Sequence, residues 1–394
     1  MAVRRLCRTD AKESVHTVSP DTAHSAISIS AVRFDRPSLA SLGERHPQSS
    51  RNLPLPGDKL RILKRTCVAV EVVSSATNLV VVDIGSTRLR YGRGTERGPV
   101  AVRAEPTRAD ALTEQLLVAV EDVRARSPGP IQGVSVSTTG LVDAERGVIA
   151  EFDANDGTRR YDVRLAEAVE DAFGLPTAVQ NDCTAAALGE YRFGEGRGYD
   201  SVAHVTFGTG IGAGVVEDGR PIRGERGYAA EVGLFSIRAD GELSSTGVRG
   251  AWEAYCSGRG IPNFARQLLA EGGEASSLRE LDEITALDVF AAADDGDDVA
   301  ETLLDRIARY NAAGVGTLVN AYDPGVVTLG GSVALENAEW MLSGIREHLD
   351  DYVLAADPPP VELTTLGEDI ELYGATAELL GPRPETSSVG QAGD

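Results

Sequence analysis

The stretch Val205–Val216 has the sequence Val-Thr-Phe-Gly-Thr-Gly-Ile-Gly-Ala-Gly-Val-Val, and the rest of the chain is organised around it. Its glycines alternate with other residues, and apolar runs flank them, so the pattern predicts a strand, a tight turn and a second strand. Glycine lets backbone N–H groups approach a ligand, and a concave row of N–H groups binds phosphate. The alternative is a glycine-rich hairpin without a ligand. The G-x-G-x-G-x-G spacing, followed by a strand, is no dinucleotide fingerprint.

Length and composition indicate a two-domain protein that works in a reducing compartment. The chain has 394 residues, of which 42% are hydrophobic, enough for two cores. It has no apolar run long enough for a membrane span and no apolar core of a signal peptide, so we expect no membrane partner. Its 4 cysteines are scattered without a C-x-x-C pair, which favours the cytoplasm over a disulfide framework.

The charge is strongly negative and unevenly distributed. The net charge is −22, yet residues 1–77 hold 12 basic and 7 acidic residues, whereas the rest holds 26 arginines against 53 acidic residues. An acidic surface repels nucleic acid, so we expect no nucleic-acid partner for the body. Acid excess with almost no lysine resembles proteins of salt-loving archaea. The body has no lysine, which excludes a Walker-type phosphate loop and a Schiff-base enzyme.

Residues 1–77 show no sustained helical or strand period. A DNA-binding arm needs two amphipathic helices joined by a short turn, and that pair is missing from the pattern. We therefore expect either a disordered tail or an upstream mis-assigned start. The stretch 383–394 is predicted to be a second disordered tail.

A second hairpin precedes the glycine-rich one. The apolar run 79–84 ends in Asp83-Ile84-Gly85-Ser86-Thr87-Arg88, and the apolar pattern resumes directly afterwards. Hydroxyls and turn amides can hold phosphate, and a carboxylate can hold Mg²⁺ or its waters. Taken alone, the segment also fits an ordinary Asp-Gly turn.

Asp182 is the candidate with the strongest placement. A short strand at 177–179 is followed by Gln180-Asn181-Asp182 and an alanine-rich helix at 183–191. A side chain at such a strand-to-helix junction is rigidly held and can face a cleft. It can equally cap the helix, and the two roles are compatible.

Helices and strands alternate along the remainder. Helices are predicted at 109–126, 165–173, 299–319, 336–349 and 371–380, and strands at 133–137, 325–329 and 361–365. Each half opens with a hairpin bearing a Gly/Thr turn and continues with this alternation. The pattern indicates an internal duplication, hence two α/β domains with a ligand in the cleft between them.

With these motifs in order, the chain resembles the ROK family (repressor, open reading frame, kinase) of the sugar kinase, actin and Hsp70 superfamily. Five segments support the resemblance over about residues 78–382: the first phosphate turn at 83–88, Gly140-Leu141-Val142-Asp143, the Asn-Asp motif in 174–190, the second phosphate turn at 207–214, and the pair Leu329-Gly330-Gly331 and Gly374-Ala375. The family's usual second glycine in the first turn is Ser86 here.

The resemblance implies two ribonuclease H-like (actin-like ATPase) domains. These would be 78–183 plus 370–382 and 184–369. It also implies a glucokinase-like enzyme that uses ATP and Mg²⁺ and phosphorylates a hexose or a hexose derivative. The enzyme is expected to form a homo-oligomer, a dimer. Asp182 would be the general base. ATP and its phosphates would be bound by Asp83, Gly85, Ser86, Thr87, Arg88, Gly208, Thr209, Gly210, Gly330, Gly331 and Gly374, with Asp83 reaching Mg²⁺ through water. The sugar would be held by Asn155, Asn181, Asp182, Glu231 and Glu253.

Two departures from the family pattern stand out. The family's Gly-Glu-Ile-Gly-His segment is Ala230-Glu231-Val232-Gly233-Leu234 here, so a histidine that touches sugar and zinc is replaced by leucine. The stretch 243–251 lacks the family's C-x-C-G-x-x-G-C cysteines. Leucine binds no metal and serine is a poor zinc ligand, so we expect no structural zinc.

Three hypotheses follow from the sequence. The first is an ATP-dependent sugar kinase, favoured by the intact Asp182 and both phosphate turns. The second is a sugar-responsive transcriptional regulator, which would require a DNA-binding arm in residues 1–77. The third is a sugar-binding protein without catalytic activity, suggested by the altered sugar pocket.

Overall fold

The fold was analysed in a computed structural model, which describes residues 77–354 and 357–381. All of these residues belong to one compact unit, Glu71–Asp394. The expectations for residues 1–76 and 383–394, a tail or a mis-assigned start and a second tail, lie outside the described residues. Within the described part, no helix combines the length and apolarity needed to cross a bilayer.

The first half forms a five-stranded sheet with strand order β3-β2-β1-β4-β8. The first two strands pair as an antiparallel hairpin, and β4 and β8 then add in parallel orientation. The central strand is buried along its whole length, because its apolar side chains meet helices on one or both faces. The strands are β1 (Leu79–Ile84), β2 (Arg88–Thr95), β3 (Gly98–Pro106), β4 (Val134–Thr138) and β8 (Thr177–Asn181).

The second half repeats this arrangement in a sheet of order β11-β10-β9-β14-β15. The glycine-rich stretch forms its antiparallel hairpin, and β14 and β15 add in parallel orientation. Two sheets with the same order and the same strand directions show that the internal duplication predicted from the sequence is real. The strands are β9 (Ser201–Phe207), β10 (Ile211–Glu217), β11 (Arg220–Pro221), β14 (Val326–Gly330) and β15 (Val361–Leu363).

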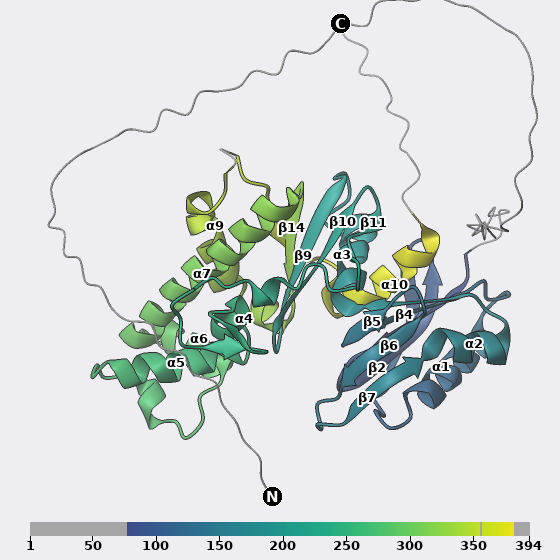
Figure 1. The fold of residues 1–394 in the computed structure, drawn as a ribbon, viewed down its shortest axis with the longest axis horizontal. Coiled ribbons are helices and arrows are strands. Elements are labelled where there is room, and N and C mark those ends of the chain that lie inside the picture. Colours follow the sequence, from purple (N-terminus) through teal and green to yellow (C-terminus); the bar gives the residue numbers. More distant parts are fainter. Residues whose placement is uncertain (1–76, 355–356, 382–394) are drawn as a thin grey trace, which may run out of the picture. The chain divides into compact units, whose positions relative to one another are not determined.

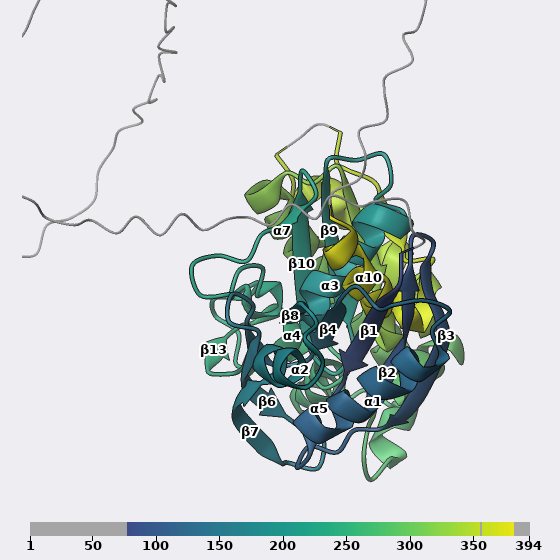
Figure 2. The same ribbon diagram turned by 90° about the vertical axis from the view of Figure 1, so that its right-hand side faces the viewer.

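Two helices run together between the sheets, as Figures 1 and 2 show from perpendicular directions. Helix α3 (Asp182–Phe193) packs on helix α10 (Ile370–Leu380) and on the β9–β10 hairpin, while α10 packs on β1 and β4. The chain therefore returns to the first sheet at its C-terminal end. The other helices are α1 (Leu112–Arg126), α2 (Leu165–Phe173), α4 (Trp252–Cys256), α5 (Gly260–Glu271), α6 (Ala286–Asp294), α7 (Asp298–Tyr322), α8 (Ser332–Glu336) and α9 (Gly344–His348).

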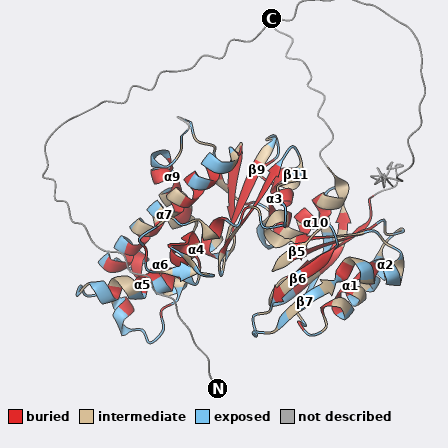
Figure 3. Ribbon diagram, viewed as in Figure 1, coloured by how far each residue is buried: buried red, intermediate tan, exposed pale blue. Residues whose placement is uncertain are grey.

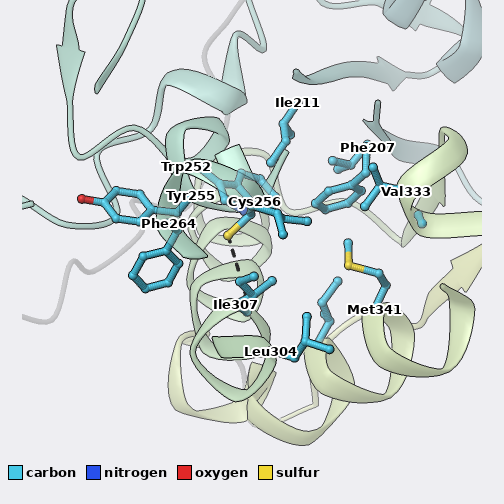
Figure 4. Packing of buried hydrophobic residues seen from close by; sticks show 14 of the residues in the cluster. Phe207, Ile211, Trp252, Tyr255, Cys256, Phe264, Leu304, Ile307, Val333 and Met341 are labelled. Atoms are coloured by element: carbon cyan, nitrogen blue, oxygen red, sulfur yellow. Dashed lines mark hydrogen bonds between the residues drawn. The ribbon is translucent and has the colours of Figure 1, made fainter. Parts of the chain in front are cut away.

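Each sheet has its own hydrophobic core, and the burial colours of Figure 3 follow the strands and the inner faces of the helices. The larger cluster belongs to the second half. In it Phe207 at the end of β9 packs edge-on against Trp252 of α4, with ring centroids 5.6 Å apart (Figure 4). The glycine-rich hairpin is thus anchored in the core of the second half.

The structure adds elements that the sequence pattern missed. Strands β5 (Leu141–Asp143), β6 (Val148–Asp153) and β7 (Arg159–Arg164) form a separate three-stranded sheet, and β12 (Ser244–Ser245) and β13 (Val248–Arg249) a small hairpin. The helix predicted at 336–349 is present as a π-helix over Glu339–Ser343 that continues into α9, and it is preceded by the separate short helix α8. The amphipathic spacing there was right, but it does not reveal that Asn337 ends α8.

Candidate active site

The first phosphate turn joins β1 to β2 and borders a cavity of about 300 Å³. The Gly85 amide donates to the carbonyl of Arg88 at 2.9 Å, and the Thr107 hydroxyl donates to the carbonyl of Gly85 at 2.7 Å. The first bond closes the turn on itself, and the second ties the turn to the residue that follows β3. The cavity is lined by Asp83, Gly85, Ser86, Thr87, Arg88, Arg90, Thr139, Asp182 and Glu371.

A buried ion cluster forms the floor of this cavity. Arg90 donates from Nη2 to Asp83 at 2.7 Å and to Glu371 at 2.8 Å, and its side chain is only 14% exposed. Burial raises the pKa of the Asp83 carboxyl, and the Arg90 charge opposes this shift. Burial, together with the Asp83 charge, likewise raises the pKa of Glu371. Arg90 therefore holds two carboxylates together that would otherwise repel one another.

Asp182 lies in the same cavity, at the first position of α3. Burial, reinforced by the Asp83 charge, raises the pKa of its carboxyl to about 6. Its Oδ1 accepts the Cys183 amide at 2.8 Å. A carboxylate with a pKa close to neutral pH is suited to general-base chemistry.

The N-cap of α3 is Asn181, and not Asp182 as one interpretation of the sequence proposed. The Asn181 side-chain oxygen accepts the amides of Cys183 and Thr184, and its side-chain nitrogen donates to the Gly140 carbonyl at 3.2 Å. The helix end is therefore satisfied mainly by Asn181. This leaves the Asp182 carboxylate available to the cavity, apart from its single bond to Cys183.

In the second phosphate turn, Gly208–Gly210, the residues Gly208 and Thr209 line another cavity, of about 320 Å³. The chain after α4 holds this turn, because the Gly258 amide donates to the Gly208 carbonyl at 2.8 Å and the Arg259 amide to the Thr209 carbonyl at 3.3 Å. Among residues 77–354 and 357–381, the amides of Thr209 and Gly210 have no hydrogen-bond acceptor. Two such amides in a turn are suited to phosphate oxygens.

The alternating glycines of this hairpin serve two purposes. A Cβ at Gly212 would lie 2.4 Å from the Cys183 sulfur, and a Cβ at Gly214 would lie 2.2 Å from the Cys183 carbonyl oxygen. These two glycines therefore let the first turn of α3 pack directly on β10, next to Asp182. The expectation that glycines let a ligand approach applies to Gly208, which lines the cavity and where a Cβ would meet nothing within 4 Å.

The adenosine-side glycines predicted from the sequence lie in different surroundings. Gly331 has a φ of +83° and caps α8, and a Cβ there would lie 2.3 Å from the Phe207 carbonyl oxygen, so it brings β14 against the second turn. Gly330 is buried beside His204. Gly374 is buried in α10, where a Cβ would lie 1.7 Å from the Ala185 carbonyl oxygen. Gly374 thus serves helix packing and does not line either cavity.

The predicted sugar ligands lie on three elements, β8, α3 and α4, and in two loops. The Glu253 carboxylate accepts the Ile211 amide at 3.1 Å and the Ser245 hydroxyl, so it contacts the glycine-rich hairpin itself. Burial and the Glu253 charge raise the pKa of Glu231. Asn155 is exposed, and its amide donates to the Ser86 carbonyl at 3.3 Å.

The segment that departs from the family's zinc pattern has other contacts. Leu234 packs partly buried against the larger core cluster. The Tyr255 hydroxyl accepts the Leu243 amide at 3.2 Å, and the Arg249 Nε donates to the Gly241 carbonyl at 2.9 Å. In the described part of the chain, no group of three or more His, Cys, Asp and Glu side chains could hold a metal ion.

Three lining residues of the first cavity escaped the sequence analysis, Arg90, Thr139 and Glu371. In the second cavity only Gly208 and Thr209 were predicted, and the remaining lining residues, among them Arg259, were not. Arg90 stands two positions beyond the first phosphate motif, and Glu371 enters from α10, far away in sequence. The signal available for Arg90 was a charge in the alternating apolar pattern of β2. For Glu371 there was none, because only the return of the last helix to the first sheet brings it there.

Comparisons with known proteins show which family shares this sequence and fold. The model of the ROK family matches residues 79–379. The glucokinase of Streptomyces coelicolor is 33% identical over 315 residues, covering 77% of this chain and 98% of that protein.

Solved structures of ROK family proteins have a similar fold. A ROK hexokinase from Thermus thermophilus superposes with a TM-score of 0.67 at 31% identity, covering 77% of this chain and 99% of that one. A ROK family glucokinase from Streptomyces griseus, in complex with glucose and AMPPNP, gives a TM-score of 0.60 at 31% identity, covering 77% and 98%. The predicted pair of actin-like α/β domains is thereby confirmed. The chain belongs to the ROK family.

Proposed function

We propose that the protein is an ATP-dependent sugar kinase that phosphorylates a hexose or a hexose derivative. The observation that favours this activity is the cavity in which Asp182, with a pKa raised to about 6, lies beside the first phosphate turn. Its relatives named glucokinase make glucose the first substrate to test. The regulator hypothesis depends on residues outside the described range, and no feature of the two cavities favours it.

Asp182 acts as the general base in this proposal. It accepts the proton of a sugar hydroxyl as that oxygen attacks the γ-phosphorus of ATP, the bond to the β–γ bridging oxygen breaks, and ADP leaves with the electron pair. Phosphoryl transfer depends mainly on positioning and on stabilisation of the spreading charge. Turn amides such as those of Thr209 and Gly210 supply part of that stabilisation.

In the first cavity, Asp83 is the residue suited to hold Mg²⁺ through water. The described residues form no metal cage, and Mg²⁺ in kinases is held by phosphates, water and one or two carboxylates. Asp83, whose Oδ2 is already bonded to Arg90, fits the role of a carboxylate that reaches the ion through water. When bound, the ion neutralises charge on the transferred phosphoryl group.

The sugar ligands in this proposal are Asn181, Glu231 and Glu253, with Asn155 close to the first turn. Asn181 is largely occupied as a helix cap, so its contribution is orientation of the Asn-Asp segment more than strong sugar binding. We further propose a homodimer in a reducing cytoplasm, without nucleic-acid or membrane partners. The charge pattern supports a salt-loving origin.

The decisive test is Asp182→Asn. The variant keeps the shape and an acceptor for the Cys183 amide but loses the proton acceptor, so turnover with glucose and ATP should fall by about 10²–10⁴-fold. Binding of AMPPNP, measured by calorimetry, should stay close to that of the wild type.

The matched control is Asp143→Asn, which makes the same chemical change at a carboxylate paired with Arg146 outside both cavities. It should leave turnover unchanged. Turnover of Asp182→Asn within a few-fold of the wild type would reject Asp182 as the base.

A further inference from the structure

Ser245 of the small β12–β13 hairpin contacts the site through a carboxylate. Its hydroxyl donates to Oε1 of Glu253, and Oε2 of the same carboxylate accepts the Ile211 amide at 3.1 Å. Ile211 is the first residue after the second phosphate turn. A chain of three groups therefore links an otherwise peripheral hairpin to the turn.

Two further hydrogen bonds hold helix α4, which carries Glu253, and the residue next to the β12–β13 hairpin. On α4, the buried Trp252 donates from Nε1 to the side-chain oxygen of Asn311 on α7 at 2.8 Å. On the hairpin side, the hydroxyl of Tyr255 accepts the Leu243 amide at 3.2 Å. The backbone on each side is thus held in place, and the Glu253 side chain is the adjustable part.

The space around the carboxylate is shaped for this arrangement. A Cβ at Gly210 would lie 2.8 Å from Oε2 of Glu253, and a Cβ at Gly233 would lie 3.0 Å from the same atom. Two glycines therefore make room for one carboxylate oxygen against the turn. Hydrogen bonds to an ionised carboxylate are about twice as strong as bonds between neutral groups.

We propose that Ser245 is a positioning residue for phosphoryl transfer, whose hydroxyl holds Glu253 on the Ile211 amide and so fixes the second phosphate turn. This inference rests on the proposed function for its catalytic meaning, but its physical content concerns the turn alone. Without the hydroxyl, the Glu253 side chain regains its rotamers, and the Ile211 amide loses its acceptor for part of the time. The turn amides are then less well ordered for phosphate.

The experiment compares Ser245→Ala with Ser244→Ala and Ser245→Thr. Ser244 is the exposed neighbour on the same strand, so its alanine variant controls for changes in the hairpin itself. Threonine at 245 keeps a hydroxyl. The readouts are hydrogen exchange of a peptide covering 208–214 in the ligand-free protein, AMPPNP affinity by calorimetry, and the KM for ATP with glucose as substrate.

Ser245→Ala should speed exchange in that peptide and weaken AMPPNP binding by about tenfold, the effect of losing one hydrogen bond to a charged group. The KM for ATP should rise in parallel while kcat changes less. Ser244→Ala should match the wild type, and Ser245→Thr should restore most of the loss.

Equal exchange and equal AMPPNP affinity in the two alanine variants would overturn the proposal, as would failure of threonine to restore either. These outcomes are separable from the fate of the proposed function. A protein that phosphorylates no sugar, yet shows the exchange and AMPPNP effects at Ser245 alone, would refute the kinase and retain the link. An active kinase in which Ser245→Ala changes neither hydrogen exchange, nor AMPPNP affinity, nor the KM for ATP would support the proposed function and refute the role of Ser245.

Discussion

At the scale of single residues, the site depends on how carboxylates are kept apart and neutralised. Asp83 and Glu371 share one guanidinium, Arg90, while Asp182 has none of its own and feels the Asp83 charge. Burial raises the pKa of Asp182 to about 6 and that of Glu371 to about 8, so within the described residues Asp182 differs from the other two by lacking an arginine partner and not by being the easiest to protonate. Such a separation of roles by environment is what a general base in an acidic cavity requires.

This electrostatic arrangement predicts the pH dependence of catalysis. The base acts only when it is deprotonated, and burial raises the pKa of Asp182 to about 6. Going down in pH through about 6, kcat/KM for ATP should therefore fall roughly tenfold per pH unit, and above that range it should reach a plateau. The measurement is initial rates with glucose from pH 5 to 8.

The control for that profile is the melting temperature over the same pH range, which separates loss of the base from unfolding. A profile that stays flat down to pH 5 while the protein remains folded would mean that the acid titrating near 6 takes no part in the reaction.

Much of the residue list was predictable and part of it was not. Asp83, Asp182 and the two glycine turns stand beside turn signals in the sequence, so local pattern marked them as candidates, while their roles came from the family resemblance and stay predictions. Glu371 is 281 residues from its partner Arg90, and no local pattern connects the two. The cap assignment to Asp182 was wrong for a related reason: Asn and Asp are equally good caps, and only backbone geometry shows that Asn181 takes the role.

At the scale of elements, the contact between α3 and α10 joins the Asn-Asp motif to the C-terminal end of the chain. The two helices approach so closely that Gly374 touches the backbone of Ala185, in the same helix that begins at Asp182. The glycine is thus required by packing, which explains its place in a motif that the sequence analysis assigned to the nucleotide.

Gly374→Ala should therefore destabilise the fold. The added Cβ would lie 1.7 Å from the Ala185 carbonyl oxygen, so one helix must move. Overpacking of this kind costs about 1–3 kcal/mol, more than the helix propensity of alanine returns. Urea unfolding checks the value, with Gly273→Ala as control, since a Cβ there meets nothing within 4 Å. A Gly374→Ala variant as stable as the wild type would show that α3 and α10 separate easily.

Elements with regular patterns were predicted well and short ones poorly. The helix at 165–173 matches α2 residue for residue, because an amphipathic face and Gly174 mark its end. The strands β6 and β7 were missed, since charged residues interrupt their alternation. Their identity comes from pairing with each other, which a local pattern does not contain.

At the scale of the whole molecule, the segment that differs from the family's zinc pattern is held by ordinary contacts. The segment 236–251 is held by hydrogen bonds, and Arg238 lies 5.7 Å from the Tyr255 ring centroid and 5.8 Å from that of Tyr310. We predict that the purified protein contains well under one zinc per chain by elemental analysis. Chelator treatment should leave its melting temperature unchanged. A stoichiometric zinc that resists chelators would contradict the comparison of 243–251 with the family's cysteine segment.

The acidity of the body makes its stability depend on salt. After residue 77 the chain has 26 arginines against 53 acidic residues, so repulsion among surface carboxylates opposes folding at low ionic strength. Salt weakens this repulsion, and the Debye length falls from about 30 Å at 0.01 M to about 3 Å at 1 M. It also weakens the exposed Arg–acid pairs, but each such pair contributes only about 0–1 kcal/mol. The excess of acids therefore dominates.

The melting temperature should accordingly rise with KCl, steeply up to a few tenths molar and then more slowly, because screening saturates once the Debye length is shorter than the spacing of the charges. The same titration with sucrose, which is uncharged and excluded from protein surfaces, should give only a gradual, nearly linear rise. If the melting temperature rose with KCl as gradually and linearly as with sucrose, the gain would come from exclusion of the solute from the protein surface and not from screening of charge. A flat or falling KCl curve would show that ion pairs outweigh the repulsion, and the comparison with salt-loving archaea would lose its physical basis.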